Sequence, residues 1–234
     1  VLDHFFWLRS LSGIFQALQW VGVWSLLAGG VLVSLQTRVD RILGYFILIE
    51  TGYSILAIGL ISQGGADALA LSFLPRALAL LQWSYTLSSV RQMEPDIDGS
   101  FASIRGLFYR LPFHSISLII ILLSLVGLPA LGLFPAKRML WNSTASITFA
   151  YAPLIAISVG LSLVLVLRLL HNLITTDPDP PSPALTMQRN ESIGSIIVLS
   201  VFSLLSLLIG LLPHFFLNPF LGILEPFTHL LLQK

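Results

Sequence analysis

The sequence predicts an all-α fold, a polytopic bundle of transmembrane helices. Of the 234 residues, 56% are hydrophobic and only 10% are charged, and the mean hydropathy is +0.90. An average soluble domain carries roughly 25% charged residues, so a soluble globule of this size could not hide so much apolar surface. A lipid bilayer acts as an apolar solvent for such a chain, and the sequence contains no strand-like pattern.

Apolar runs of about 20 residues, the length needed to cross a bilayer, recur along the chain. They predict about six spans: Ile14–Leu35, Ile42–Ser62, Ala68–Val90, Leu111 to about Thr144, Ile147–Leu170 and Ile193–Leu212. The tail from Phe215 to Leu232 is apolar but contains two prolines. We expect it to form a short C-terminal helix, either along the interface or as a last short span.

The fourth run is too long for one straight span at about 1.5 Å per residue. It contains Gly127, Pro129, Gly132 and Pro135 in close succession. Glycine and proline at this density interrupt a helix. We therefore predict a discontinuous helix with its break near Gly127–Pro135.

Composition excludes several classes of function. A net charge of +1 gives no basic face for nucleic acid, so we expect no nucleic-acid partner. The chain has no cysteine, which excludes disulfides and cofactors bound through thiolates. Its five histidines are scattered without an i, i+4 pair, so we expect no haem or zinc site.

Several ionisable residues fall inside the apolar runs, among them Glu50, Arg76 and Lys137, while Arg168 and His171 close the fifth run. A charge near the middle of a bilayer costs at least about 2.5–3.5 kcal/mol, so such residues usually face protein or water and have a function. The second and third spans are antiparallel, and counting from their short loop places Glu50 and Arg76 within about one helical turn in depth. We predict an intramembrane ion pair, which is either a tuned protonatable carboxylate or a static lock between helices.

Lys137 follows the predicted helix break, where freed carbonyls and water can gather. Burial penalises the charged form of a lysine, which suits a proton relay. The alternative is a lysine at a helix end that extends toward the interface, with Arg138 beside it.

Three stretches of the sequence resemble the antiporter-like membrane subunits of respiratory complex I and the related Mrp antiporters. The segment from Leu35 through Tyr53 is similar to the family pattern Gln-Thr-Asp-Leu-Lys-Arg-Leu-Leu-Ala-Tyr-Ser-Ser-Ile-Ser-His-x-Gly-Tyr. Arg105-Gly-Leu-Phe-Tyr-Arg-Leu-Pro112 resembles the loop before the broken helix. Leu123-Ser-Leu-Val-Gly-Leu-Pro-Ala-Leu-Gly-Leu-Phe-Pro-Ala-Lys137 looks like Leu-Ser-Leu-Ala-Gly-Ile-Pro-Pro-x-x-Gly-Phe-x-x-Lys. The likeness is greatest to subunit N (subunit 2).

The order of these motifs implies that residues 1–234 are a single transmembrane domain. It resembles helices nine to fourteen of the fourteen-helix core, which are the second inverted repeat and one trailing helix. The first repeat, with its own broken helix and lysine, has no counterpart. We therefore expect a fragment, the product of a split gene, or an incompletely represented longer chain.

The chain departs from the family pattern at several positions. Asp40 stands where the family has the lysine of a Lys-Arg pair, and Glu50 stands where it has histidine. Phe46 and Ile47 replace paired serines, and valine and leucine replace the tyrosines before Arg168. Lys137 alone matches the family's lysine, so the proton-relay role carries over to that position only.

The resemblance implies a membrane subunit of a complex-I-like NADH:quinone oxidoreductase, a translocase that couples proton movement to redox chemistry. Glu50 and Arg76 would tune Lys137, and the chain itself would bind no redox cofactor. NADH, FMN, iron–sulfur clusters and quinone are expected in partner subunits. Two alternatives stay open: an Mrp-type secondary cation/proton antiporter subunit, and a degenerate structural subunit that conducts nothing.

The expected partners are other membrane subunits, the lipid bilayer and a separate chain that supplies the absent half. The expected location is a bacterial plasma membrane or a mitochondrial inner membrane, ahead of the thylakoid.

Overall fold

A computed structural model describes residues 12–147, 150–175 and 191–215 of the chain, and these residues are almost entirely helical. One isolated bridge between Arg38 and Ser100 is the sole β-type pairing among them. The helices, with a short 3₁₀ turn η2 at Ile61–Gln63, are α2 Ser12–Ser34, α3 Val39–Gly59, α4 Gly65–Met93, α5 Leu107–Arg110, α6 Pro112–Val126, α7 Phe134–Ile147, α8 Tyr151–Ile174 and α9 Ile193–Leu211.

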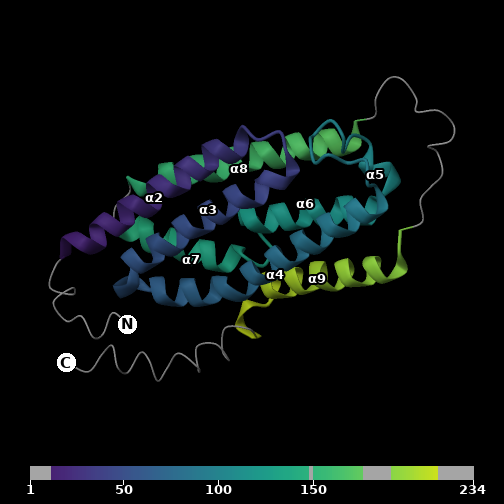
Figure 1. Cartoon of the computed structure of the whole chain (residues 1–234). Coiled ribbons are helices and arrows are strands. Elements are labelled where there is room, and N and C mark those ends of the chain that lie inside the picture. The colour runs from purple at the N-terminus through teal and green to yellow at the C-terminus, as the bar shows by residue number, and fades with distance from the viewer. Residues whose placement is uncertain (1–11, 148–149, 176–190, 216–234) are drawn as a thin grey trace.

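The long helices lie roughly side by side in an elongated bundle (Figure 1). α2 packs between α3 and α8, and α9 packs against α4 and α6. α6 and α7 follow one another end to end, which is the arrangement of a single interrupted span. The loops that join α2 to α3 and α4 to α5 lie at one end of the bundle, where α6 also begins.

Four of the described helices are long and apolar enough to cross a membrane: α2, α3, α8 and α9. The chain is therefore an integral membrane protein by the length and composition of its helices. α4 has 29 residues but carries several polar and charged side chains, while α6 and α7 are each shorter than a span. Six crossings stay a prediction, and the predicted helix in the tail lies outside the described residues.

The predicted discontinuous helix is confirmed. α6 ends at Val126 and α7 begins at Phe134. Gly127 has a φ of +88°, a conformation that residues with a Cβ rarely adopt, and its N–H bonds the carbonyls of Leu123 and Ser124. The N–H of Leu128 returns to Leu123 at 3.1 Å, which completes a glycine-type helix cap. Pro129, which follows, has no N–H with which to continue the helix.

Small residues allow α2 and α3 to approach closely. A Cβ at Gly22 would lie 2.7 Å from the backbone nitrogen of Leu56, and a Cβ at Gly52 would lie 3.0 Å from the carbonyl of Gly22. Close contact through small residues drives helix association in lipid, where the hydrophobic effect between helices is absent. This packing fixes α3, and with it Glu50, at the centre of the bundle.

Candidate proton-exchange site

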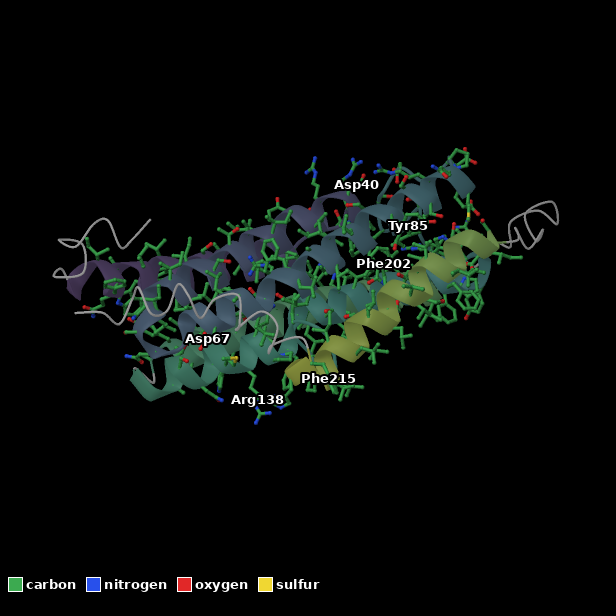
Figure 2. All side chains as sticks on the ribbon, turned by 90° about the horizontal axis from the view of Figure 1, so that it is seen from below. Asp40, Asp67, Tyr85, Arg138, Phe202 and Phe215 are labelled. Atoms are coloured by element: carbon green, nitrogen blue, oxygen red, sulfur yellow. The ribbon has the colours of Figure 1, made fainter. Side chains whose placement is uncertain are left out.

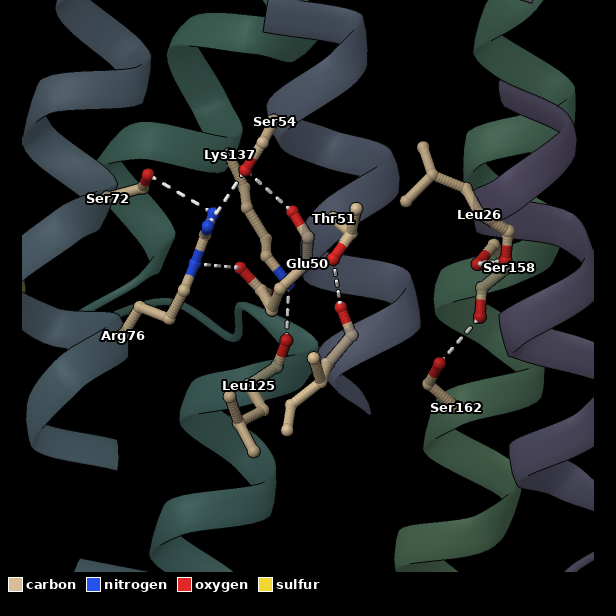
Figure 3. Close-up of polar contacts among 11 residues, drawn as sticks. Leu26, Glu50, Thr51, Ser54, Ser72, Arg76, Leu125, Lys137, Ser158 and Ser162 are labelled. Atoms are coloured by element: carbon tan, nitrogen blue, oxygen red, sulfur yellow. Dashed lines mark hydrogen bonds and ion pairs between the residues drawn. The ribbon is translucent and has the colours of Figure 1, made fainter. Parts of the chain in front are cut away.

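Three of the ionisable residues that the sequence places inside apolar runs meet at one point. Glu50 comes from α3, Arg76 from α4 and Lys137 from α7 (Figure 3). The Nε of Arg76 lies 3.2 Å from Oε2 of Glu50, and the Nζ of Lys137 lies 2.8 Å from Oε1 of the same carboxylate. The pairing of Glu50 with Arg76 agrees with the depth count from the sequence, and Lys137 joins the pair from the far side of the helix break.

Hydroxyl groups hold the Arg76 guanidinium in place. Its Nη1 donates to Ser54 Oγ at 2.8 Å, and its Nη2 donates to Ser72 Oγ at 3.3 Å. Ser54 in turn donates to the backbone carbonyl of Glu50 at 2.9 Å. A planar guanidinium suits such a fixed set of acceptors, because its donors point in set directions. Arg76 therefore has one orientation, directed at Glu50.

The helix break positions Lys137. In a continuous helix the carbonyl of Leu125 would accept the N–H four residues on, but that residue is Pro129, which has none. Lys137 Nζ donates to this freed carbonyl (Figure 3). The ammonium also lies 4.4 Å from the centre of the Tyr53 ring, a cation–π contact. The lysine therefore turns into the bundle, and it does not extend to the interface.

The cluster is buried. The exposed fraction is 4% for the Glu50 side chain, 10% for Lys137 and 23% for Arg76. A cavity of about 10 Å³ adjoins it, lined by Tyr53 and Ala136 together with the three charged residues. That volume admits about one water molecule. One water molecule can therefore contact the cluster inside the bundle.

The charges of the cluster define the chemistry open to it. With Lys137 protonated, two cations face one carboxylate, and the three side chains carry a net charge of +1. With Lys137 neutral, Glu50 and Arg76 form a balanced pair. Loss and gain of one proton at Nζ therefore switch the cluster between two charge states.

The second departure from the family pattern, Asp40, lies away from this cluster at the end of the bundle. Its carboxylate pairs with Arg91 and lies 3.7 Å from Arg38. The cleft beside it, between α3 and α4, has a volume of about 470 Å³ and is lined by Trp83 among others, but by none of the three clustered residues. The structure therefore separates Asp40 and Glu50, which the motif places ten residues apart.

A second buried ionisable pair escaped the sequence analysis. His114 at the start of α6 contacts Glu191, which precedes α9. Glu191 lies outside every apolar run, and 77 residues separate the two. The available signal was the set of serines in the otherwise apolar α9, which indicates a polar face.

The chain has relatives of known type. A family model described as NADH:quinone oxidoreductase/Mrp antiporter, TM, matches residues 3–173. The chain belongs to this family. It is 26% identical over 219 residues to NADH-quinone oxidoreductase subunit N of Acinetobacter baumannii, covering 92% of this chain and 44% of that protein. It is 29% identical over 185 residues to subunit N of Shewanella woodyi, covering 76% of this chain and 39% of that protein.

Solved structures show the same fold. A chain of respiratory complex I from Thermus thermophilus with bound NADH matches with a TM-score of 0.78 at 19% identity, over 95% of this chain and 45% of that chain. A chain of the Mrp complex from Dietzia sp. matches with a TM-score of 0.73 at 17% identity, over 88% and 46% respectively. The 234 residues thus span less than half the length of the relatives they match.

The residues of this chain do not fit a redox cofactor held through thiolates, because the chain has no cysteine. Within the described ranges, no three His, Asp or Glu residues gather where they could hold a metal ion. The described chain instead offers the buried Glu50–Arg76–Lys137 cluster.

Proposed function

We propose that this chain acts in a membrane subunit of a complex-I-like NADH:quinone oxidoreductase and takes part in redox-coupled proton translocation. One observation carries the proposal: Lys137 lies at a helix break, buried, in contact with Glu50, which Arg76 also pairs. The family membership and the likeness to subunit N relatives support it.

In this function Lys137 takes up and releases the proton. Glu50 is the counter-charge that stabilises a protonated lysine in the bundle, and Arg76 holds the Glu50 carboxylate in position. The redox reaction and its cofactors, NADH, FMN, iron–sulfur clusters and quinone, belong to partner subunits. The chain itself exchanges protons only.

The proposed placement follows from the same likeness. The chain corresponds to helices nine to fourteen, as one transmembrane domain, and packs against other membrane subunits in the bilayer. A separate chain that supplies the remaining helices stays a prediction. The bacterial relatives favour a bacterial plasma membrane over a mitochondrial inner membrane.

The test compares NADH-driven proton pumping in membrane vesicles between the wild-type complex and Lys137→Ala at matched assembly. We expect pumping to fall by at least about tenfold, because a positioned proton-transfer group contributes about 10²–10⁴-fold. Arg138→Ala is the matched control, since Arg138 is the next residue and points out of the bundle (Figure 2). Unchanged pumping in Lys137→Ala would contradict the proposal and favour the alternative of a structural subunit that conducts nothing.

An Mrp-type cation/proton antiporter subunit is the second candidate. The family description covers both classes, and the Mrp fold superimposes closely. Sodium-dependent proton movement in vesicles without NADH would favour it, while pumping that requires NADH would favour the oxidoreductase.

A further inference from the structure

A second polar cluster lies where α4, α6 and α9 meet. At its end, His114 is completely buried and the Glu191 side chain is 6% exposed. The family match ends at residue 173, so Glu191 and α9 lie outside the matched segment. The cluster thus joins a helix of the matched segment to one beyond it.

Both ring nitrogens of His114 have partners. Nδ1 lies 3.2 Å from Glu191 Oε1, and Nε2 lies 2.8 Å from Ser89 Oγ. The backbone N–H of Phe113 also donates to Glu191 Oε1, at 3.1 Å. The other carboxylate oxygen, Oε2, is buried and has no hydrogen-bond donor among the described residues. A buried acceptor without a donor is unfavourable, and a proton placed on it relieves the charge.

Hydroxyl and amide groups continue from this pair along the same three helices. Ser89 lies 3.2 Å from Ser195, and the side-chain nitrogen of Gln82 donates to Ser117 and Ser203 at 2.9 Å each. We call the α4–α6–α9 seam the set of polar residues that runs from the His114–Glu191 pair to the helix break: Ser89, Ser195, Gln82, Ser117, Ser203, Ser124 and Ser206. The hydroxyl of Tyr85 on α4, labelled in Figure 2, donates to Ser195 on α9 at 3.5 Å.

The seam reaches the helix break. Ser206 donates to Ser124 at 3.3 Å, and the N–H of Gly132 in the break lies 3.4 Å from the Ser206 oxygen. Ser124 directly precedes Leu125, whose carbonyl binds Lys137. Two hydrogen-bonded groups of polar residues therefore recur along one interface, one near the start of α6 and one at the helix break beside the residue whose carbonyl binds Lys137.

The opposite face of α9 is apolar and exposed, with Ile197, Val201 and Leu204 more than half exposed. Serines at a helix interface can serve merely to hold helices together in lipid. A titratable pair does more than that, because neutral serines give the same adhesion without burying a charge.

We propose that His114 and Glu191 form a proton-exchange station at the end of the α4–α6–α9 seam, and that protons pass between this station and Lys137 along the seam. The proposal rests on the proposed function. It adds a route for the protons and the pair of residues at which that route ends. A proton that reaches Nε2 makes the ring an imidazolium. The Nδ1 proton then passes to Glu191, which leaves a neutral ring and a carboxylic acid. Release from the acid restores the carboxylate. Tautomerisation of the ring, in which one proton leaves Nε2 and one binds Nδ1, then restores the first tautomer with no net change in the number of protons.

The experiment measures protons pumped per NADH oxidised by the assembled complex in vesicles. Glu191→Gln keeps the size of the side chain and removes its titration, so the ratio should fall several-fold. Glu191→Asp keeps the titratable group and should recover most of the wild-type ratio. Glu94→Gln is the control, because Glu94 pairs with Arg110 at the same end of the bundle but lies outside the seam.

A wild-type ratio in Glu191→Gln would overturn the station. If the complex with Glu191→Gln fails to assemble, the same ratio of protons to NADH is measured in the His114→Gln variant. Loss of assembly in both variants would assign the pair to holding α9 and overturn the proposal. Lys137→Ala in the same assay separates the two proposals. Loss of pumping there with a normal Glu191→Gln rejects the station alone, whereas normal pumping in both rejects the proposed function as well.

Discussion

Two groups of charges in this molecule contain the same kinds of side chain and have opposite surroundings. Glu50, Arg76 and Lys137 pair inside the bundle, where the carboxylate is 4% exposed. Asp40 and Arg91 pair at the end of the bundle, where the side chains are 27% and 55% exposed. Water and salt screen the pair of Asp40 and Arg91, so this pair contributes little to stability. Removing one member of the buried cluster leaves an unpaired buried charge, which is strongly destabilising. Burial, and not the geometry of the ion pair alone, therefore decides how much each group of charges contributes to stability.

The largest expected effect is on Glu50. Glu50→Ala leaves Arg76 and Lys137 buried as like charges without a carboxylate, and should lower the free energy of unfolding by about 3–5 kcal/mol. Thermal unfolding of the detergent-solubilised protein measures it. The double variant Glu50→Ala/Lys137→Met should unfold at a higher temperature than Glu50→Ala. A double variant no more stable than the single one would contradict the charge argument.

Gly127→Ala tests whether the backbone of the break supports the cluster. Alanine in the left-handed conformation costs about 1–2 kcal/mol. A Cβ there would also lie 2.6 Å from Cδ of Lys137, so the lysine must move from Glu50. We expect intermediate destabilisation, by thermal unfolding, together with reduced pumping. Gly44→Ala is the control, since a Cβ at Gly44 meets nothing within 4 Å.

Asp40→Asn should change stability by only about 0–1 kcal/mol, because its pair with Arg91 is largely solvated. The same unfolding measurement checks this, with pumping unchanged at matched assembly. A loss as large as that of Glu50→Ala would break the comparison between the two groups.

The smallest effect concerns Asp98, in the loop before α5. The backbone N–H of Ser100 and the hydroxyls of Ser100 and Ser103 lower the pKa of Asp98 from 3.8 to about 2. A carboxylate with a lowered pKa stabilises the folded loop above pH 3.8 and loses that contribution as the pH falls to about 2. Hydrogen exchange of the 98–103 amides over this range should show the loss, and Asp98→Asn should show no such pH dependence.

Local chemistry predicted much of the fold and part of the site. Gly127 and Pro129 indicate the break because each acts on its own backbone, and the short loop before α4 fixes the depth of Arg76 relative to Glu50. The contact between Lys137 and Glu50 was not predictable in the same way. The direction in which α7 leaves the break depends on packing against α4 and α8, which no local rule supplies.

The His114–Glu191 pair shows a different limit. Glu191 belongs to no apolar run and follows a Pro-rich segment, so its sequence setting is that of an ordinary loop residue. Only the packing of α9 against α4 and α6 buries it. Family likeness did not help either, because the matched residues end before it.

The order of the three clustered residues along the chain has a consequence for synthesis. Ribosomes deliver Glu50 first, then Arg76, then Lys137. Each charge alone is costly to place in lipid. The turn of residues 60–64 joins α3 to α4 so closely that carboxylate and guanidinium can enter the bilayer as one hairpin with no net charge. The lysine, arriving last, finds its counter-ion already in the bilayer, so insertion of the hairpin prepares the site that the lysine completes.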